Sequence, residues 1–558
     1  MKAGTALFGL PAAARAGSLL AAALAGSGLD RLESAYADLA ELHAQIQVTK
    51  ARGASRSLAG VDLPSLQARF AQARGRVASL MPLAQAQAGT EDERALIAMK
   101  RALEERLTGA GTDEAPGGAS TLDCAYEPDA LARGPDGLET LRARIYSCYG
   151  RTARSLTLDG ETLDRLTVLA RLGETGDAAA RRRLFLALDP LWRSVNGDGG
   201  PLSPYRRLIA LTTASKDAAP PLESRARALG LDPATLESGL VSILEAWRDA
   251  APAASLEPWD YWYANEAASR ALSPRVPRAR LEELNRRFFR SLGADPESLG
   301  IHFDLEPRPG KTPVAFTDFG AAPRRRGRSW SRGELWVFAT YRAGGLGNLT
   351  ELLHETGHGI HIAAIRTRPA FATWPDSDPF TEALADLPAL EAYEPEWQRK
   401  YLGASAGLAD CLRSKYGSIV LDVAWALFEV EMQRRPGADP NRVWTDITRA
   451  YLRIAPHPEL SWWAMRGQLV DAPGYMTNYA IGAILAADLR ARAREGRGPL
   501  WSGDRGYYAW LSGRLYRFGL ERPSRDVLSA FLGRAPSPAA LLADLSRISA
   551  ASGSPPPS

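Results

Sequence analysis

The sequence predicts a large, mainly α-helical protein with two lobes and one small β-sheet. Through most of the first 300 residues, apolar side chains recur every three or four positions, which is the spacing of one helix face. The run Glu334 to Tyr341, ELWVFATY, has the composition of a strand. Directly after it, residues 354 to 358 read HETGH, so we expect the sheet to lie beside a helix that carries this motif.

Length and composition exclude several classes of protein. The chain has 558 residues, of which 45% are hydrophobic and 24% are charged, as in soluble globular proteins. The formal net charge is only +4, which is no basis for nucleic-acid binding. No apolar run reaches the roughly 18 residues that a membrane span needs. The three cysteines make neither a metal cluster nor a disulfide framework, although one bridge between Cys124 and Cys148 would suit an exported protein.

The first 26 residues allow two interpretations. Lys2 and Arg15 precede an apolar run that ends in Ala23-Leu24-Ala25, a sequence similar to a signal-peptide cleavage site. Arg15 interrupts the longer apolar stretch, however, and the remaining run is short. Residues 1–26 are therefore either a secretory signal or a disordered or helical N-terminus, and the sequence favours the cytoplasm slightly over the periplasm or secretion.

The helix around HETGH has local signals for its start and end. Asn348 followed by Glu351 predicts a capping box, and Pro369 is expected to stop the helix. Glycine costs about 1 kcal/mol in a helix interior. Gly357 and Gly359 therefore predict a close approach by a neighbouring backbone or a ligand.

The motif itself predicts a metal site. His354 and His358 are four residues apart, so they lie on one helix face about 6 Å apart along the axis and can reach the same Zn²⁺. Glu355 follows the first histidine and is placed to act as a base toward a water molecule. The competing interpretation is a helix with two ordinary surface histidines.

A second helix supplies the third predicted ligand. Asp378 as N-cap and Pro379 at the first helical position predict its start. Glu382 then falls near the first turn and faces the motif if the two helices are antiparallel. A carboxylate suits the third position around zinc and leaves a fourth position open. Asp386, one turn later, is predicted to accept a hydrogen bond from the free N–H of a ligand histidine, and the alternative is an ordinary acidic residue of the helix.

These residues resemble a known group of enzymes. HETGHGIH, followed by the glutamate at 382 in FTEALAD, is similar to the helical gluzincin peptidases: thimet oligopeptidase, oligoendopeptidase F and the peptidase domain of angiotensin-converting enzyme. His361 matches a histidine often found after the motif in the oligopeptidases. The resemblance is specific from about 301 to 545 and only generally helical before that. It implies a two-lobed zincin-type fold, one Zn²⁺ per chain and a peptide substrate.

The resemblance also implies two tyrosines near the metal. Tyr475 and Tyr479 match a pair in which one member stabilises the oxyanion, and we assign that role to Tyr479 and substrate contact to Tyr475. Two positions depart from the pattern. Val470 stands where a histidine is usual, and Gly482 stands where an aromatic residue is expected. The nearest histidine in the sequence is His457.

Two further segments bear on substrate binding. The strand Glu334 to Tyr341 is predicted to offer an open edge to an extended peptide, as in strand addition. The alternative is a buried strand in a small sheet, which does not exclude the edge role. Arg324 to Arg328 is interpreted as a solvated basic loop, with a role in binding substrate carboxylates as the alternative.

Together these observations predict a zinc metallopeptidase that hydrolyses oligopeptides. We expect residues 27–300 to form a helical N-terminal lobe, 301–550 the catalytic part and 551–558 a disordered tail. The alternatives are a non-catalytic zinc- or peptide-binding helical protein and a metal-free protein with a chance motif. The sequence leaves the cleavage preference, the choice between endo- and exopeptidase and the oligomeric state open.

Overall fold

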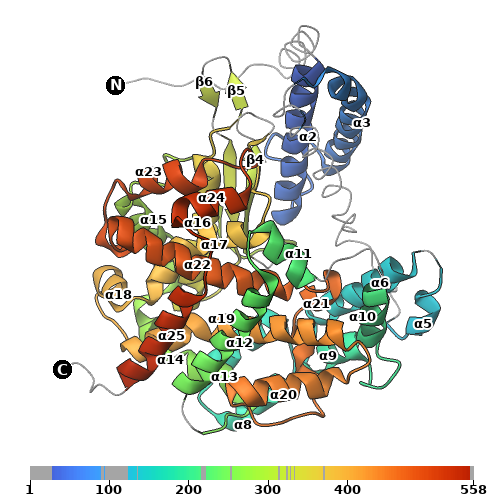
Figure 1. Cartoon of the computed structure of the whole chain (residues 1–558), viewed down its shortest axis with the longest axis vertical. Helices are drawn as coiled ribbons and strands as arrows, with labels where there is room; N and C mark the ends of the chain where they lie inside the picture. Colours follow the sequence, from blue (N-terminus) through green and yellow to red (C-terminus); the bar gives the residue numbers. More distant parts are fainter. Residues whose placement is uncertain are drawn as a thin grey trace.

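Figure 1 shows the computed structural model of the chain. It describes residues 28–89, 94, 124–134, 136–214, 221–251, 254–311, 315–321, 324–326, 329–331, 333–367 and 371–552. The predicted N-terminal segment 1–26, residues 553–558 of the predicted tail and most of the helical run from 91 to 107 lie outside these ranges.

The first half of the described chain is mainly helical, as its apolar periodicity predicts. Its α-helices are α2 (Gly28–Ala51), α3 (Leu63–Gln87), α5 (Pro128–Leu131), α6 (Gly137–Thr152), α7 (Arg165–Glu174), α8 (Ala178–Leu186), α9 (Asp189–Asn196), α10 (Pro204–Ala214), α11 (Pro221–Ala228), α12 (Pro233–Ala250), α13 (Tyr261–Asn265), α14 (Ala267–Leu272) and α15 (Leu281–Ser291). Three short 3₁₀ turns interrupt them: η1 (Pro258–Asp260), η2 (Ser273–Arg275) and η3 (Arg278–Arg280). A hairpin of β1 (Leu156–Leu158) and β2 (Glu161–Leu163) joins α6 to α7.

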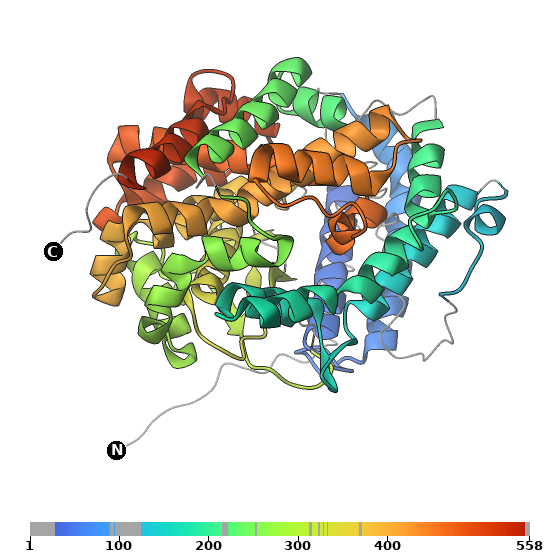
Figure 2. The same ribbon diagram turned by 90° about the horizontal axis from the view of Figure 1, so that it is seen from below.

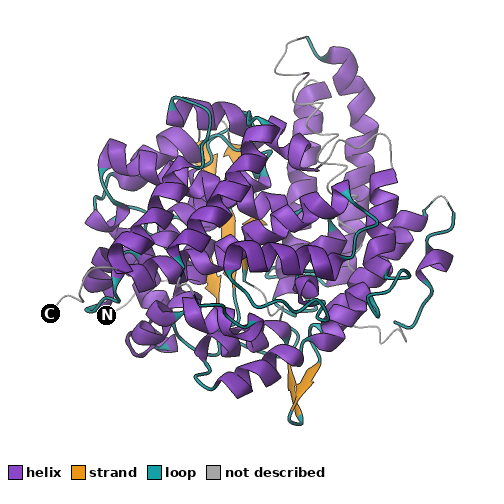
Figure 3. Cartoon of the chain, turned by 60° about the horizontal axis from the view of Figure 1, so that its bottom comes forward, coloured by secondary structure: helices purple, strands orange, loops and turns teal. Residues whose placement is uncertain are grey.

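The second half returns to helices after a short β region, and Figure 3 shows how small the strand content is. Its α-helices are α16 (Leu346–Ala364), α17 (Asp378–Ala389), α18 (Pro395–Leu402), α19 (Leu408–Arg434), α20 (Pro440–Leu452), α21 (Gln468–Asp471), α22 (Met476–Arg497), α23 (Tyr507–Leu511), α24 (Ser524–Leu532) and α25 (Ala539–Ser552). The short turns are η5 (Leu390–Tyr393), η6 (Trp462–Met465), η7 (Leu500–Ser502) and the π-helical turn η8 (Ser512–Tyr516). The predicted mainly helical fold is confirmed.

The main sheet has three strands in the order β3-β7-β4. β3 (Ile301–Asp304) runs parallel to β7 (Glu334–Phe338), and β4 (Phe316–Ala321) runs antiparallel to it. β7 therefore pairs on both sides, and the prediction that this strand offers an open edge is wrong. Its apolar composition reflects burial at the centre of the sheet. Among the described strands, β4 is an edge strand of this sheet.

The sheet lies between two helices. Residues alternate between the two faces of a strand, so Leu335 and Val337 of β7 join the main core with the leucines of α16. Trp336 and Phe338 face the other way and contact the end of α2 through Val48. This arrangement presses α16, which carries the HETGH motif, against one face of the sheet.

The basic segment near the sheet is not simply a loop. Arg324 to Arg326 forms β5 (Arg324–Arg326), which pairs antiparallel with β6 (Ser329–Ser331). The prediction of a loop is therefore wrong for its first three residues. Pairing in the hairpin satisfies the backbone groups that a loop would leave to water.

The helices α2 and α3 stand side by side at one edge of the molecule (Figure 1), and the view in Figure 2 places them behind the C-terminal helices. They share a small apolar cluster of their own that includes Leu39, Leu66 and Val77, and Phe371 packs into it. The main core runs through both halves of the chain, from Ala44 to Ile548.

A buried charge network ties α22 to its neighbours. Arg490 Nη2 lies 2.6 Å from Glu391 Oε1 and 3.1 Å from Glu394 Oε1, and all three side chains are at most 5% exposed. Lys415 of α19 lies 3.3 Å from Glu394 and 3.1 Å from Asp544 of α25. Since breaking one partner of a buried pair leaves an uncompensated charge, we expect the loss of any one of these side chains to destabilise the packing of α19, α22 and α25.

Two sequence expectations concern covalent and membrane features. Cys124 and Cys148 form the disulfide that the sequence left open, and Cys411 is buried and free. None of the described helices is long and apolar enough to cross a membrane.

Candidate metal centre

The N-cap of helix α16 lies three residues before Asn348, the cap that the sequence predicts. Its first residue is Leu346 and its N-cap is Gly345, whose φ of +105° suits glycine. The side chain of Asn348 turns back instead and donates to the carbonyl oxygen of Gly344 at 3.1 Å. The capping box with Glu351 is therefore wrong, because Asn348 already lies inside the first turn.

The two glycines of α16 mark close contacts, as predicted. A Cβ atom on Gly357 would lie 2.7 Å from the carbonyl oxygen of Ala385 in α17. A Cβ atom on Gly359 would lie 3.0 Å from Ile301 Cδ1 in β3. Larger residues would push α16 away from these neighbours, so Gly357 sets the distance of α16 from α17 and Gly359 sets its distance from β3.

Helix α17 starts one residue earlier than predicted. Its N-cap is Ser377, whose Oγ accepts the backbone N–H of Phe380 at 3.4 Å. Asp378 and Pro379 are the first two helical residues, so Asp378 as N-cap is wrong by one position. Serine and aspartate are equally good caps in isolation, and only the backbone conformation distinguishes them.

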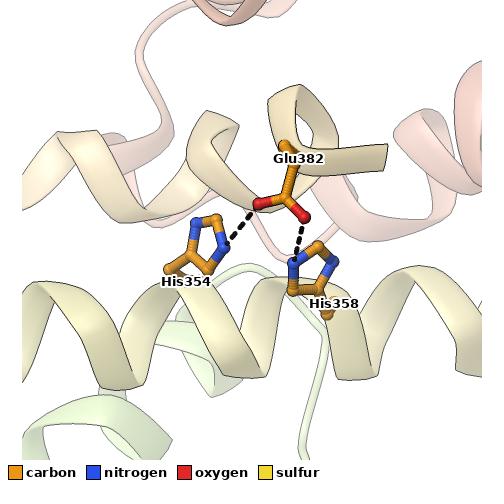
Figure 4. A group of neighbouring side chains, drawn as sticks. All are labelled: His354, His358 and Glu382. Carbon is orange, nitrogen blue, oxygen red and sulfur yellow. Dashed lines mark ion pairs between the residues drawn. The ribbon is translucent and has the colours of Figure 1, made fainter. Parts of the chain in front are cut away.

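Two histidines and one glutamate converge between α16 and α17 (Figure 4). His354 Nε2 lies 3.3 Å from Glu382 Oε2, and His358 Nε2 lies 3.7 Å from Glu382 Oε1. His354 also meets Asp386, one turn beyond Glu382, which shows that the two helices run in opposite directions. The three predicted ligands are thus brought together from two packed helices.

The geometry of this cluster fits a metal ion. The candidate ligand atoms of His354, His358 and Glu382 all lie within 4.8 Å of one another. Ligand atoms bound tetrahedrally to zinc at about 2.0–2.2 Å are roughly 3.4 Å apart. Two imidazole nitrogens and one carboxylate are also the donor types that zinc prefers, and three ligands leave a fourth position free.

The charges of the cluster are strongly coupled. Burial by itself would lower the pKa of His354, but the carboxylates of Asp386 and Glu382 raise that pKa well above its usual value. Burial would raise the pKa of Glu382, but its hydrogen bonds with His354 and His358 hold it below the usual range. A metal ion bound here would replace the proton that the cluster otherwise holds, so binding would weaken as the pH falls.

Asp386 lies where the sequence predicts a supporting residue. Its Oδ1 is 2.7 Å from His354 Nδ1 and accepts the N–H of that nitrogen. The bond leaves His354 Nε2 free to face Glu382. A carboxylate in this place orients the histidine ring and raises its basicity.

Asp386→Asn is expected to weaken metal binding and peptide cleavage by about 10–100-fold without abolishing either. The amide still accepts a hydrogen bond from His354 but carries no charge. Metal titration and kcat/KM measure the effect. Asp376→Asn is a matched control, because Asp376 binds Ser524 rather than a histidine. Equal metal affinity and rate in Asp386→Asn and wild type would contradict the supporting role.

Glu355 is oriented by the sheet. The side chain is 7% exposed, and Thr317 Oγ1 of β4 lies 2.7 Å from both its backbone oxygen and its Oε2. The sequence analysis did not identify Thr317, because nothing local to residue 317 shows which helix its strand will meet. The edge strand therefore holds the predicted base in place.

Trp374 is a second site residue that the sequence analysis missed. Its ring packs edge-on against His358 at a centroid distance of 5.4 Å and against Phe319 of β4 at 5.7 Å. The ring of His361 also lies near Trp374, at a centroid distance of 6.1 Å, and is completely buried. Burial and the neighbouring His358 lower the pKa of His361 to about 3, so its imidazole is neutral. His361 is not part of the metal-ligand cluster in the described residues.

The two tyrosines lie on the side of α22 that meets α17. Residues 475, 479 and 482 share one helix face, and a Cβ atom on Gly482 would lie 3.9 Å from Glu382 Cβ. The rings of Tyr475 and Tyr479 are 5.6 Å apart, and Gln468 donates to the Tyr479 hydroxyl at 3.1 Å. Burial, with a contribution from Glu382, raises the pKa of both tyrosines, so both hydroxyls keep their protons.

The two positions that depart from the resembled pattern lie in closely packed surroundings. A Cβ atom on Gly482 would already be in van der Waals contact with Pro379 and Glu382 of α17, so the helices are closely packed at this position. Val470 is buried in the core. His457 does not replace the missing histidine, because its ring nitrogens bind Glu257 and Glu459 at 2.8 and 2.7 Å.

Comparison with known proteins supports the fold. No protein-family model and no curated protein matches the chain. Among solved structures, Trypanosoma cruzi metallocarboxypeptidase 1 is similar with a TM-score of 0.53 and 14% identity, over 93% of this chain and 99% of that one. An M32 carboxypeptidase from Deinococcus radiodurans R1 has a TM-score of 0.53 and 14% identity, over 94% and 98%. A Pyrococcus furiosus carboxypeptidase has a TM-score of 0.52 and 13% identity, over 94% and 99%. At these identities the likeness concerns the fold, and the resemblance to helical metallopeptidases expected from the sequence is confirmed at that level.

Proposed function

We propose that the protein is a zinc-dependent metallopeptidase that binds one Zn²⁺ through His354, His358 and Glu382. The observation that carries this proposal is the convergence of these three ligands next to Glu355, which Thr317 holds in place. A purely structural zinc site needs no base, so this arrangement favours an enzyme over a zinc-binding scaffold. We keep residues 27–300 and 301–550 as the proposed helical and catalytic parts.

The reaction we propose is the hydrolysis of a peptide bond. When bound, zinc would supply Lewis acidity and lower the pKa of a water molecule to about 7. Glu355 would take the proton of the attacking water and pass it to the leaving amine. Tyr479, which keeps its proton, would donate a hydrogen bond to the developing oxyanion. Tyr475 would contact the substrate beside it.

We propose that β4 rather than β7 receives the peptide backbone. No other described strand pairs with the outer edge of β4, and its Thr317 meets Glu355. An extended peptide that added to this edge would run past the candidate metal ligands. The sequence analysis predicted this role for β7, which is the central strand of the sheet and has no open edge.

Removing the metal is expected to abolish cleavage of a broad peptide library, and adding Zn²⁺ back is expected to restore it. Digestion with and without a chelator, followed by mass spectrometry, measures both effects. The positions of the cuts also distinguish an endopeptidase from a carboxypeptidase, the class to which the similar proteins belong. A protein that binds zinc and peptides but cleaves nothing would support the scaffold hypothesis instead.

Tyr479→Phe is expected to lower kcat by about 10²–10³ with little change in KM, because the lost hydroxyl acts mainly in the transition state. Steady-state kinetics with one peptide from the library checks this. Tyr475→Phe is the matched comparison, since the two rings are one helical turn apart. If only Tyr475→Phe lowers kcat, the roles of the two tyrosines are exchanged.

A further inference from the structure

The turn that leads into α22 is held by a buried carboxylate. Glu429 of α19 is 1% exposed. Its Oε1 accepts the backbone N–H of Gly474 at 2.6 Å, and its Oε2 accepts the backbone N–H of Met476 at 2.8 Å. These two residues flank Tyr475. The two oxygens of one carboxylate therefore accept hydrogen bonds from the backbone on either side of Tyr475, a residue of the proposed site.

Helix α11 holds the same turn from the other side. Arg225 donates to the carbonyl oxygen of Gly474 and, at 2.7 Å, to Thr477 Oγ1. Its guanidinium carbon lies 5.8 Å from the centre of the Tyr475 ring. Gly474 has a φ of +88°, and a Cβ atom there would lie 2.4 Å from Pro221. The turn consequently has little freedom as long as these contacts are made.

The charge on Glu429 is finely balanced. Burial raises the pKa of Glu429 to about 7, against the opposing effects of the two N–H groups and of Arg225. The groups that face it are Arg225 from α11 and, from α10, Tyr205, whose pKa burial and Glu429 together raise. A protonated carboxyl group has one hydroxyl oxygen, which is a weaker acceptor, so proton uptake would weaken one of the two bonds to the turn.

We infer that Glu429 is a positioning residue, which holds the turn at Gly474 and Met476 so that Tyr475 and Tyr479 keep the placement that the reaction requires. The expected effect on catalysis rests on the proposed function. The ordering of the turn by Glu429 can be measured independently of catalysis. A displacement of about 1 Å at a reacting group can lower a rate about a hundredfold. If the hydrogen bonds from Glu429 to this turn are lost and the tyrosines shift, kcat should therefore fall.

The test variant is Glu429→Gln, which keeps the size of the side chain but turns one acceptor oxygen into an NH₂ group. We expect amide hydrogen exchange, corrected for the intrinsic rate, to become at least about tenfold faster in the segment 472–478. In the wild type, protection of this segment should increase as the pH rises through about 7, and in the variant it should stay low and independent of pH. We expect kcat to fall at least about tenfold while KM and zinc content stay within about twofold.

Asp488→Asn is the matched control. Asp488 is also completely buried and lies on α22, the helix that this turn leads into, but it binds Arg534 at 2.5 and 2.8 Å and the backbone N–H of Ser537 at 3.0 Å. This variant should lower thermal stability and leave both the exchange of 472–478 and kcat unchanged. A general loss of stability is thereby separated from a loss of positioning.

A second variant covers the case in which Glu429→Gln does not fold. Thr477→Val keeps the shape of the side chain and removes the hydroxyl that donates to Gly474 at 2.7 Å and accepts from Arg225. It should loosen the same turn and lower kcat in the same direction. Unchanged exchange in the segment 472–478 of both folded variants would overturn the positioning role.

The remaining outcomes separate this inference from the proposed function. Faster exchange with a wild-type kcat would overturn the claim that the reaction depends on the placement of these tyrosines. If the wild-type protein cleaves no peptide, the proposed function fails, while the exchange data still decide whether Glu429 holds the turn.

Discussion

Glu355→Gln is expected to slow peptide cleavage by at least about a hundredfold while the metal stays bound, since general-base catalysis is worth roughly 10²–10⁴-fold. Glutamine keeps the size of the side chain and still accepts a hydrogen bond from Thr317, which lies 2.7 Å from Glu355 Oε2. It cannot accept the proton of the attacking water. When all three are measured on the same preparation, zinc content and peptide binding should therefore equal those of the wild type, and only kcat should fall.

Glu396→Gln is the control for this experiment. Glu396 is an exposed glutamate of α18 that pairs with Arg399, so the same chemical change is made on a helix that supplies no residue of the candidate centre. Its kcat should stay near the wild-type value. Cleavage at the wild-type rate by Glu355→Gln would show that the chemistry takes place elsewhere in the molecule.

Glu382→Ala should remove most of the zinc and, with it, all measurable cleavage. Two histidines on one helix remain, but the ligand that reaches across from α17 at 3.3 and 3.7 Å is gone. A catalytic zinc site normally has three protein ligands, and losing one leaves the ion to compete with water and chelators. Metal analysis after dialysis against a weak chelator measures the loss.

Glu396→Ala provides the comparison for Glu382→Ala. Glu396 is an exposed glutamate on α18 that pairs with Arg399 rather than with a histidine. This control should retain its zinc and its activity. Full zinc retention by Glu382→Ala would show that the third ligand is another residue, and the cluster in Figure 4 would have to be reassigned.

The sequence predicted the residues of the candidate centre because their signals are local. His354 and His358 are related by the helical repeat alone, and any helix over 346–364 places them on one face. Glu382 and Asp386 are related in the same way on the next helix. Their approach to the motif needed only one further assumption, that consecutive helices pack antiparallel, and the pairing of His354 with Asp386 agrees with it.

The boundaries of these helices were predicted less well. The caps at Gly345 and Ser377 differ from the expected Asn348 and Asp378. Serine, asparagine and aspartate all bind backbone N–H groups in short turns, so a sequence that contains several of them allows more than one start. The choice depends on where the chain enters the helix, and contacts outside the helix decide this.

The tertiary structure alone decided which strand lies at the edge of the sheet. The composition of β7 shows that it is a strand but not that β3 and β4 lie on both sides of it. For the same reason Thr317 and Trp374 could not be identified, since each meets its partner across a long stretch of sequence. Glu429 also contacts its turn across more than forty residues.

What the sequence by itself determined is therefore the helical fold class and the chemistry on α16 and α17, because hydrophobic periodicity and ligand spacing act within one or two helices. What only the tertiary structure decided is how that chemistry is supported: Thr317 on Glu355, Trp374 on His358 and Glu429 on the turn before α22. These contacts depend on strand pairing and helix packing, which arise from burying the whole core at once and leave no pattern in any short segment.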